Sequence, residues 1–145
     1  TDIAKITGWW NKTPLANIGI PMGEKSGLVA LDVDNRHNGD KSLAALEAEY
    51  GKLPTTITAT TGSGGKHYVF KYTEELAIKN AVGFRDGLDV RTQGGLIVAA
   101  PSMHQSGNRY AWDEGLSPFE CEAAEMQSSP TFWNTENTVS LQSRF

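Results

Sequence analysis

The sequence predicts an α+β fold, with a mainly antiparallel sheet and two or three helices packed against it. Three observations predict this class. Apolar residues recur at helical spacing in only two stretches, and the second half of the chain is a succession of short β-rich segments. Residues 55–71 also form a strand–glycine turn–strand unit that is typical of a hairpin. Such hairpins argue against a doubly wound parallel sheet.

One helix and two strands are predicted before residue 35. Apolar residues spaced three and four apart between positions 3 and 10 share one face of a helix, which Thr1 can cap. Residues 17–20 form a short strand between two prolines. Residues 27–34 (GLVALDVD) are apolar and β-prone, so they are predicted to form a central strand.

A second helix follows a polar loop at residues 35–39. Asp40 is the expected N-cap, and Gly51 stands where a helix commonly ends. The apolar stripe between them consists of Leu43, Leu46 and Tyr50.

The second half is predicted to be mostly strands. Residues 55–61 and 67–71 are the arms of the hairpin, and a polar helix or loop occupies residues 73–80. A short helix is expected at 119–126, and the polar tail 127–145 is expected to be poorly ordered or to pack only through Phe132 and Trp133. Three further strands are predicted, at residues 88–91, 96–99 and 109–112.

Composition limits the functional classes. The single cysteine, Cys121, cannot form an internal disulfide, which favours a reducing, cytoplasmic setting. No apolar run reaches the ~18–20 residues that span a bilayer, so no membrane partner is expected. The net charge of −4 gives no general support for nucleic-acid binding. Carboxylates that hold metal ions, however, no longer act as bare negative charges.

Asp32 and Asp34 are the first candidate site residues. Because side chains alternate along a strand, the two carboxylates point to the same face while Val33 packs behind them. Paired carboxylates repel unless a cation lies between them, and hard oxygen ligands suit Mg²⁺ or Mn²⁺. The alternative is that both are ordinary strand-end residues that lead into a polar loop.

The glycine-rich turn at residues 62–67 (GSGGKH) is the second candidate. Glycines allow backbone N–H groups to approach a phosphate, and Ser63, Lys66 and His67 add donors. The spacing excludes a P-loop, because Thr60 stands where that motif needs its first glycine. Strand alternation favours His67 over Lys66 as the residue that faces the site. The alternative is a plain hairpin turn.

Asp89 and Arg91 are co-facial on the strand predicted at residues 88–91. Asp89 could complete a three-carboxylate metal site, and Arg91 could hold a phosphate or a template strand. The alternative is a simple ion pair. His104 is interpreted as a structural residue rather than a ligand.

Taken in order, three segments resemble the catalytic domain of the bifunctional DNA primase/polymerase family, of the archaeo-eukaryotic primase type. They are residues 17–34, 62–70 and 87–112. The resemblance implies an RRM-like primase core in residues 1–126. It also implies template-directed nucleotidyl transfer from an NTP or dNTP in plasmid, phage or prophage replication.

The resemblance also implies roles for single residues. Asp32, Asp34 and Asp89 would bind two Mg²⁺ or Mn²⁺ ions, and His67 would contact the phosphates of the incoming nucleotide. Nucleotide or primer–template contacts are further expected from Ser63, Gly64, Gly65, Lys66 and Arg91.

The partners implied are an NTP or dNTP, single-stranded DNA template or primer–template, and a helicase domain outside this chain. The family's domain usually begins with a further strand–helix stretch, so the sequence is expected to be a truncated or a divergent short form. Two alternatives remain open. One is a non-catalytic module that binds nucleotide or nucleic acid, and the other is a metal-dependent nuclease or a glycosyltransferase.

Overall fold

Strand β2 (Leu28–Val33) runs through the centre of a six-stranded sheet in the computed structural model, which describes residues 2–126 and 132–133. The strand order is β5-β6-β2-β4-β3-β8, and every pairing is antiparallel. The α+β class with a mainly antiparallel sheet is therefore confirmed. The other strands are β1 (Ile18–Pro21), β3 (Ile57–Thr60), β4 (Lys66–Lys71), β5 (Ala81–Arg85), β6 (Leu88–Arg91), β7 (Leu96–Ala99) and β8 (Ala111–Trp112).

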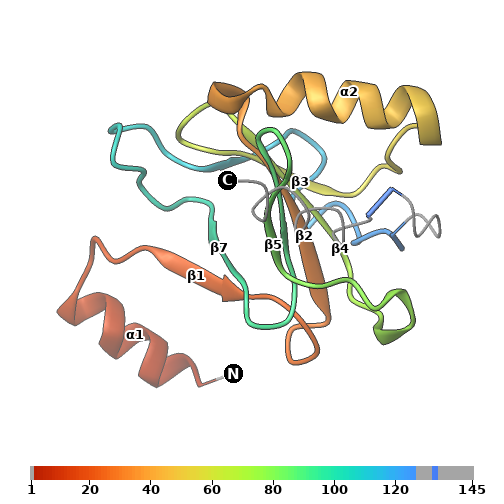
Figure 1. Cartoon of the computed structure of the whole chain (residues 1–145). Helices are drawn as coiled ribbons and strands as arrows, with labels where there is room; N and C mark the ends of the chain where they lie inside the picture. Colours follow the sequence, from red (N-terminus) through yellow and green to blue (C-terminus); the bar gives the residue numbers. More distant parts are fainter. Residues whose placement is uncertain (1, 127–131, 134–145) are drawn as a thin grey trace, which may run out of the picture.

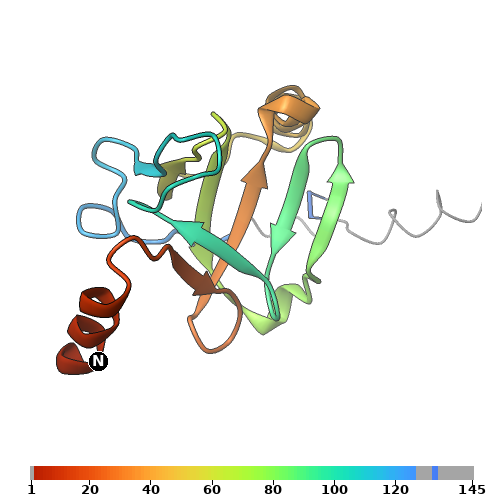
Figure 2. The same cartoon turned by 90° about the vertical axis from the view of Figure 1, so that its left-hand side faces the viewer.

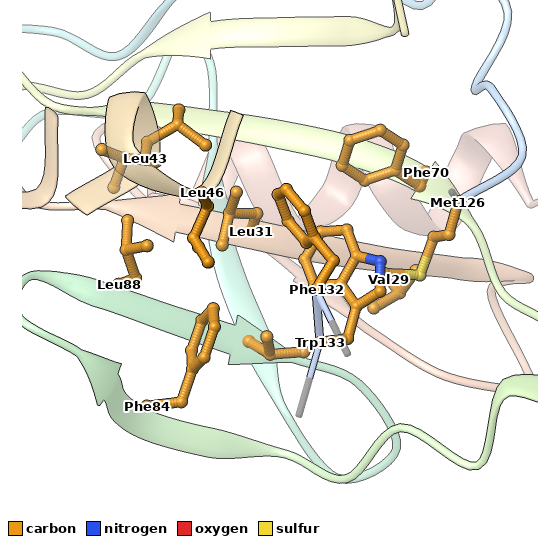
Figure 3. Close-up of a cluster of buried hydrophobic side chains, with 12 residues drawn as sticks. Val29, Leu31, Leu43, Leu46, Phe70, Phe84, Leu88, Met126, Phe132 and Trp133 are labelled. Atoms are coloured by element: carbon orange, nitrogen blue, oxygen red, sulfur yellow. The ribbon is translucent and has the colours of Figure 1, made fainter. Parts of the chain in front are cut away.

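Helix α2 (Gly39–Tyr50) covers one face of this sheet (Figure 1). Alternation along β2 sends its odd-numbered residues to this face, where they meet Leu43 and Leu46 of the helix. Figure 3 shows these side chains pointing toward one another between the helix and the strands. The contribution of β2 to this core consists of Val29, Leu31 and Val33, each no more than 2% exposed.

Phe132 and Trp133 complete the same core. They are 0% and 2% exposed, and Figure 3 places them beside Phe70 and Met126. The ring of Trp133 meets that of Phe70 edge-on, with 5.9 Å between the centroids. The tail was expected to be poorly ordered or to pack only through these two residues, and both are packed in the core. The rest of 127–145 lies outside the described residues.

The opposite face of the sheet is covered in part by a two-stranded sheet of β1 and β7. Ile97 of β7 packs there against Ala30 of β2 and Val69 of β4. Figure 2 shows β7 crossing the half of this face where β2 begins. The half where β2 ends remains free of β7, and polar side chains gather there.

Helix α1 (Ile3–Lys12) stands apart from the sheet (Figure 1), and none of its residues is buried. Its N-cap is Asp2, whose carboxylate accepts a hydrogen bond of 3.0 Å from the backbone N–H of Lys5. The predicted cap, Thr1, lies outside the described residues. Among the described residues, no helix has the length and apolar character needed to cross a bilayer.

The start of α2 differs from the prediction. Asn38, with φ of 62°, is the N-cap, and Asp40 lies in the first turn. The cause is a close contact between chain segments, because a Cβ on Gly39 would lie 2.4 Å from the carbonyl oxygen of Gly87. The helix therefore begins where Gly39 lies against Gly87, in the turn that precedes β6. The predicted polar loop before it contains a 3₁₀ turn, η1 (Asn35–His37).

The second half contains one strand that was not predicted and lacks one helix that was. Strand β5 was not anticipated, because Gly83 (φ of 64°) and a register shift interrupt its β-prone residues. The helix expected at 119–126 is absent, and that segment is irregular. Instead, the backbone of Ala124 pairs with the sheet: its carbonyl accepts a hydrogen bond of 2.9 Å from Lys71 N–H. The segment 73–80 contains a short 3₁₀ turn, η2 (Glu74–Leu76).

Candidate active site

Asp32 lies directly between two polar partners on neighbouring strands. Its Cα pairs with His67 of β4 on one side and with Asp89 of β6 on the other. Because directly opposite residues point to the same face of a sheet, three side chains predicted from separate motifs meet in one row. The row lies on the face away from α2, at the end that β7 leaves uncovered.

A pocket with a volume of about 730 Å³ opens over this row. Asp34, one residue beyond the end of β2, also lines it, as does Ser63 of the glycine turn. The predicted site residues that line the pocket are Asp32, Asp34, Asp89, Ser63 and His67.

The carboxylate of Asp34 is fully engaged by the turn that follows it. The guanidinium of Arg36 donates from Nε to Oδ1 (3.0 Å) and from Nη2 to Oδ2 (2.9 Å). The backbone N–H of Arg36 also donates to Oδ1, and His37 Nδ1 lies 2.9 Å from Oδ2. The Arg36 side chain, supported by His37, holds the pKa of Asp34 far below its usual range.

Asp89 is held in a similar way. Its Oδ2 accepts a hydrogen bond of 2.6 Å from Nη2 of Arg91, and its Oδ1 accepts one of 2.6 Å from the backbone N–H of Gly83. Arg91 lies on the same sheet face but does not line the pocket. The structure therefore gives Arg91 a carboxylate partner beside the site.

His67 is buried, with 5% of its surface exposed. Its Nε2 lies 3.5 Å from Oδ1 of Asp32, and its Nδ1 has no hydrogen-bond partner among the described residues. The ring of Tyr110 stacks on the imidazole with 5.9 Å between centroids. Burial, with a further effect from the Asp32 carboxylate, raises the pKa of Tyr110.

The glycine turn has a mainly structural geometry. The N–H groups of Gly64 and Gly65 are both used within the turn, by the carbonyl and the hydroxyl of Thr61. A Cβ on Gly65 would lie 2.2 Å from the carbonyl oxygen of Val33, so the turn needs glycine there to pass under β2. The Ser63 hydroxyl lies 3.1 Å from that of Thr61 and faces the pocket.

Lys66 does not line the pocket with the other predicted site residues. It points to the other face of β4, where its Nζ donates to the carboxylate of Asp113 (2.5 Å) and to the hydroxyl of Thr60 (2.8 Å). Burial tends to raise the pKa of Asp113, but the hydrogen bonds from Lys66 and Thr60 outweigh it and leave that pKa lowered.

Several residues that line the pocket were missed by sequence reasoning, among them Arg36, His37, His104 and Tyr110. Arg36 and His37 follow the Asp pair within two and three residues, which is a signal that local spacing could have given. His104 is brought in by its loop, which is pressed against the glycine turn. A Cβ on Gly62 would lie 2.1 Å from the Cβ of His104.

The donor chemistry of the site suits a hard divalent cation, since four carboxylates line one pocket: those of Asp32, Asp34, Asp86 and Asp89. The present side-chain arrangement does not form a ready metal site. Among the described residues, no group of three histidine, cysteine or acidic side chains has a metal-binding arrangement. Of the three predicted ligands, Asp34 and Asp89 are each turned to an arginine, and Asp32 is the one without an arginine ion pair in the described part of the chain.

Comparison with known proteins adds one match. The family model described as bifunctional DNA primase/polymerase, N-terminal, matches residues 1–129. No curated protein matches the sequence.

Proposed function

The chain belongs to the bifunctional DNA primase/polymerase N-terminal family, and on that basis we propose that it catalyses template-directed nucleotidyl transfer. The substrate would be an NTP or dNTP, and the acceptor a primer 3′-hydroxyl or an initiating nucleotide on single-stranded DNA. The observation that carries the proposal is the register of β2, which sets Asp32 between His67 and Asp89 at one pocket.

Asp32, Asp34 and Asp89 would hold Mg²⁺ or Mn²⁺. Bound metal ions at such a site activate the attacking hydroxyl and stabilise charge on the leaving pyrophosphate. Asp34 has two partners on each carboxylate oxygen and must release one of them to bind a cation. Each oxygen of Asp89 accepts a single hydrogen bond, so it keeps a lone pair for a cation.

The chain's remaining task is to bind and orient the nucleotide. A volume of about 730 Å³ falls within the ~300–1,000 Å³ range of small-molecule sites. His67 lines the pocket, and its buried Nδ1 has no hydrogen-bond partner in the described residues, which leaves the ring capacity for one more polar contact, such as a phosphate oxygen. Tyr110 packs against the imidazole ring and limits its rotation.

Primer extension tests this proposal. Labelled primer–template is incubated with dNTPs or NTPs and Mn²⁺ or Mg²⁺, using the wild-type chain, Asp32→Asn and Asp89→Asn. Extension by the wild type and its loss in both variants is the expected result. Trimming of the primer would indicate a nuclease instead, and an unchanged primer would contradict catalysis. Lys79→Ala, an exposed change outside the pocket, is the control.

A second candidate is a non-catalytic module that binds nucleotide or nucleic acid. The observation that favours it is the pairing of Asp34 and Asp89 with arginines, which leaves no assembled metal site in the described residues. A thermal-unfolding titration with Mn²⁺, with and without dNTP, separates the two. A shift with dNTP but none with Mn²⁺ would favour the module.

A further inference from the structure

The side chain of Arg36 forms a two-pronged ion pair with Asp34 inside the pocket. Its Nε and Nη2 reach different oxygens of the carboxylate, at 3.0 and 2.9 Å. With the Arg36 backbone N–H and His37 Nδ1 also in contact, each oxygen of Asp34 has two partners. A cation can use Asp34 only by displacing at least one of them.

The fold does not need this guanidinium to shape the turn. Asp34 is the N-cap of η1, and its Oδ1 accepts a hydrogen bond from the backbone N–H of Arg36. The N–H of Gly39 donates to the carbonyl oxygen of Asp34 (3.0 Å). The Arg36 side chain is 55% exposed, and it lines the pocket. A guanidinium that has left Asp34 remains beside the site, where it can bind another anion.

Arg91, the partner of Asp89, differs in each of these respects. Its side chain is only 27% exposed and does not line the pocket. The second oxygen of Asp89 is held by the backbone N–H of Gly83. Of the two arginines, only Arg36 is placed to exchange partners within the pocket.

We propose that Arg36 is a nucleotide-binding residue that alternates between two anions, the carboxylate of Asp34 and the phosphate oxygens of a bound nucleotide. A divalent cation that takes Asp34 frees the guanidinium for phosphate. The same planar fork fits a carboxylate and a phosphate, so one set of N–H groups serves both. This inference rests on the proposed function.

The exchange of Arg36 between its two anions couples the binding of the metal ion to the binding of the nucleotide. Without nucleotide, the cation must compete with Arg36 for Asp34. With nucleotide present, Arg36 has a new partner, and that competition is relieved. Because linkage is reciprocal, each ligand strengthens the binding of the other by the same factor.

Two binding measurements on Arg36→Ala test the exchange. Mn²⁺ binding without nucleotide is followed by the electron paramagnetic resonance signal of the free ion. Removal of the competitor should tighten it about threefold to fivefold, as expected for an exposed two-pronged pair. Binding of dATP at saturating Mn²⁺, followed by calorimetry, should weaken at least about tenfold. The two changes have opposite signs.

Arg85→Ala is the matched control. Arg85 also lines the pocket, but its guanidinium donates to the backbone carbonyl of Phe84 rather than to a carboxylate. This variant removes the same charge without freeing Asp34, so the Mn²⁺ affinity should rise less than in Arg36→Ala. Equal rises in both variants, or unchanged dATP binding in Arg36→Ala, would overturn the exchange.

Failure of the exchange can be told apart from failure of the proposed function. If the wild-type chain extends primers and binds Mn²⁺, but Arg36→Ala lacks the opposed changes, only the exchange is wrong. If the wild type neither binds Mn²⁺ nor extends primers, both proposals are wrong.

Discussion

Asp32 of β2 and Asp89 of β6 lie directly opposite each other on adjacent antiparallel strands. Like charges in such positions repel, and they lower stability by up to about 1 kcal/mol. Asp89 is contacted directly by Arg91 and by the N–H of Gly83. Asp32 instead lies 3.5 Å from His67 and is attracted to Arg36 without a direct ion pair. This costly arrangement is the kind expected where carboxylates serve a function.

Asp32→Asn should stabilise the protein while abolishing primer extension. The amide removes the repulsion from Asp89 and keeps the shape of the side chain, so the free energy of unfolding should rise by about 0.2–1 kcal/mol. Urea denaturation measures it. Asp34→Asn is the comparison, because it loses the Arg36 pair and should gain no stability. A destabilised, active Asp32→Asn would contradict the prediction.

Tyr110→Ala should impair nucleotide use through His67, whereas Tyr110→Phe should not. The stacked ring, rather than the hydroxyl, limits the rotation of the imidazole. When the ring of Tyr110 is removed, the imidazole of His67 can rotate, so KM for dNTP should rise several-fold, with a smaller effect on kcat. Steady-state primer extension separates the two constants. Equal losses in the Phe and Ala variants would assign the effect to the hydroxyl instead.

The ion pair of Asp34 should make stability depend on pH in acid. The Arg36 side chain lowers the pKa of Asp34 below its usual value of 3.8, so the pair contributes stability above about pH 4. That contribution is lost as the pH falls through the folded-state pKa. The stability difference between wild type and Asp34→Asn should therefore shrink between pH 5 and about pH 2. Denaturation at several pH values measures it, and a constant difference would refute the prediction.

Gly65→Ala should destabilise the fold by about 1–3 kcal/mol, because the new methyl group would meet the Val33 carbonyl oxygen at 2.2 Å. Gly8→Ala is the control, since a Cβ there would meet no atom within 4 Å apart from the backbone of its own helix and its chain neighbours. Thermal unfolding compares them. A melting temperature for Gly65→Ala equal to that of the wild type would show that the turn can shift.

Phe132→Ala should lower the free energy of unfolding by about 3–5 kcal/mol, as expected for emptying a fully buried aromatic position. Phe119→Ala serves as the control, because Phe119 is 91% exposed. Similar stabilities for the two variants would mean that Phe132 does not complete the core.

The row formed by Asp32, His67 and Asp89 could be predicted from the sequence, because it depends only on the alternation of side chains along strands. The patterns around Asp32, His67 and Asp89 each fix a sheet face, and the predicted antiparallel pairing allows the three to meet. The same alternation predicts that His67 and Lys66 point to opposite faces of the sheet, and the structure places them so.

Other features depend on contacts between distant segments. The start of α2 is fixed by the approach of Gly39 to Gly87, which no local capping pattern encodes. The segment 119–126 is helical in composition but finds backbone partners on β4, so it stays irregular. His104 reaches the pocket only because its loop packs on Gly62.

The placement of the site on the sheet divides it into two parts of unequal rigidity. Asp32, His67 and Asp89 belong to three strands that each have a neighbour on both sides. The amide hydrogens of such strands are expected to exchange with solvent only when much of the sheet opens. Arg36 and His37 belong to a single exposed turn, which can open by itself. In a pocket built in this way, the residues on the sheet are expected to stay in place while the residues of the turn adjust to a ligand.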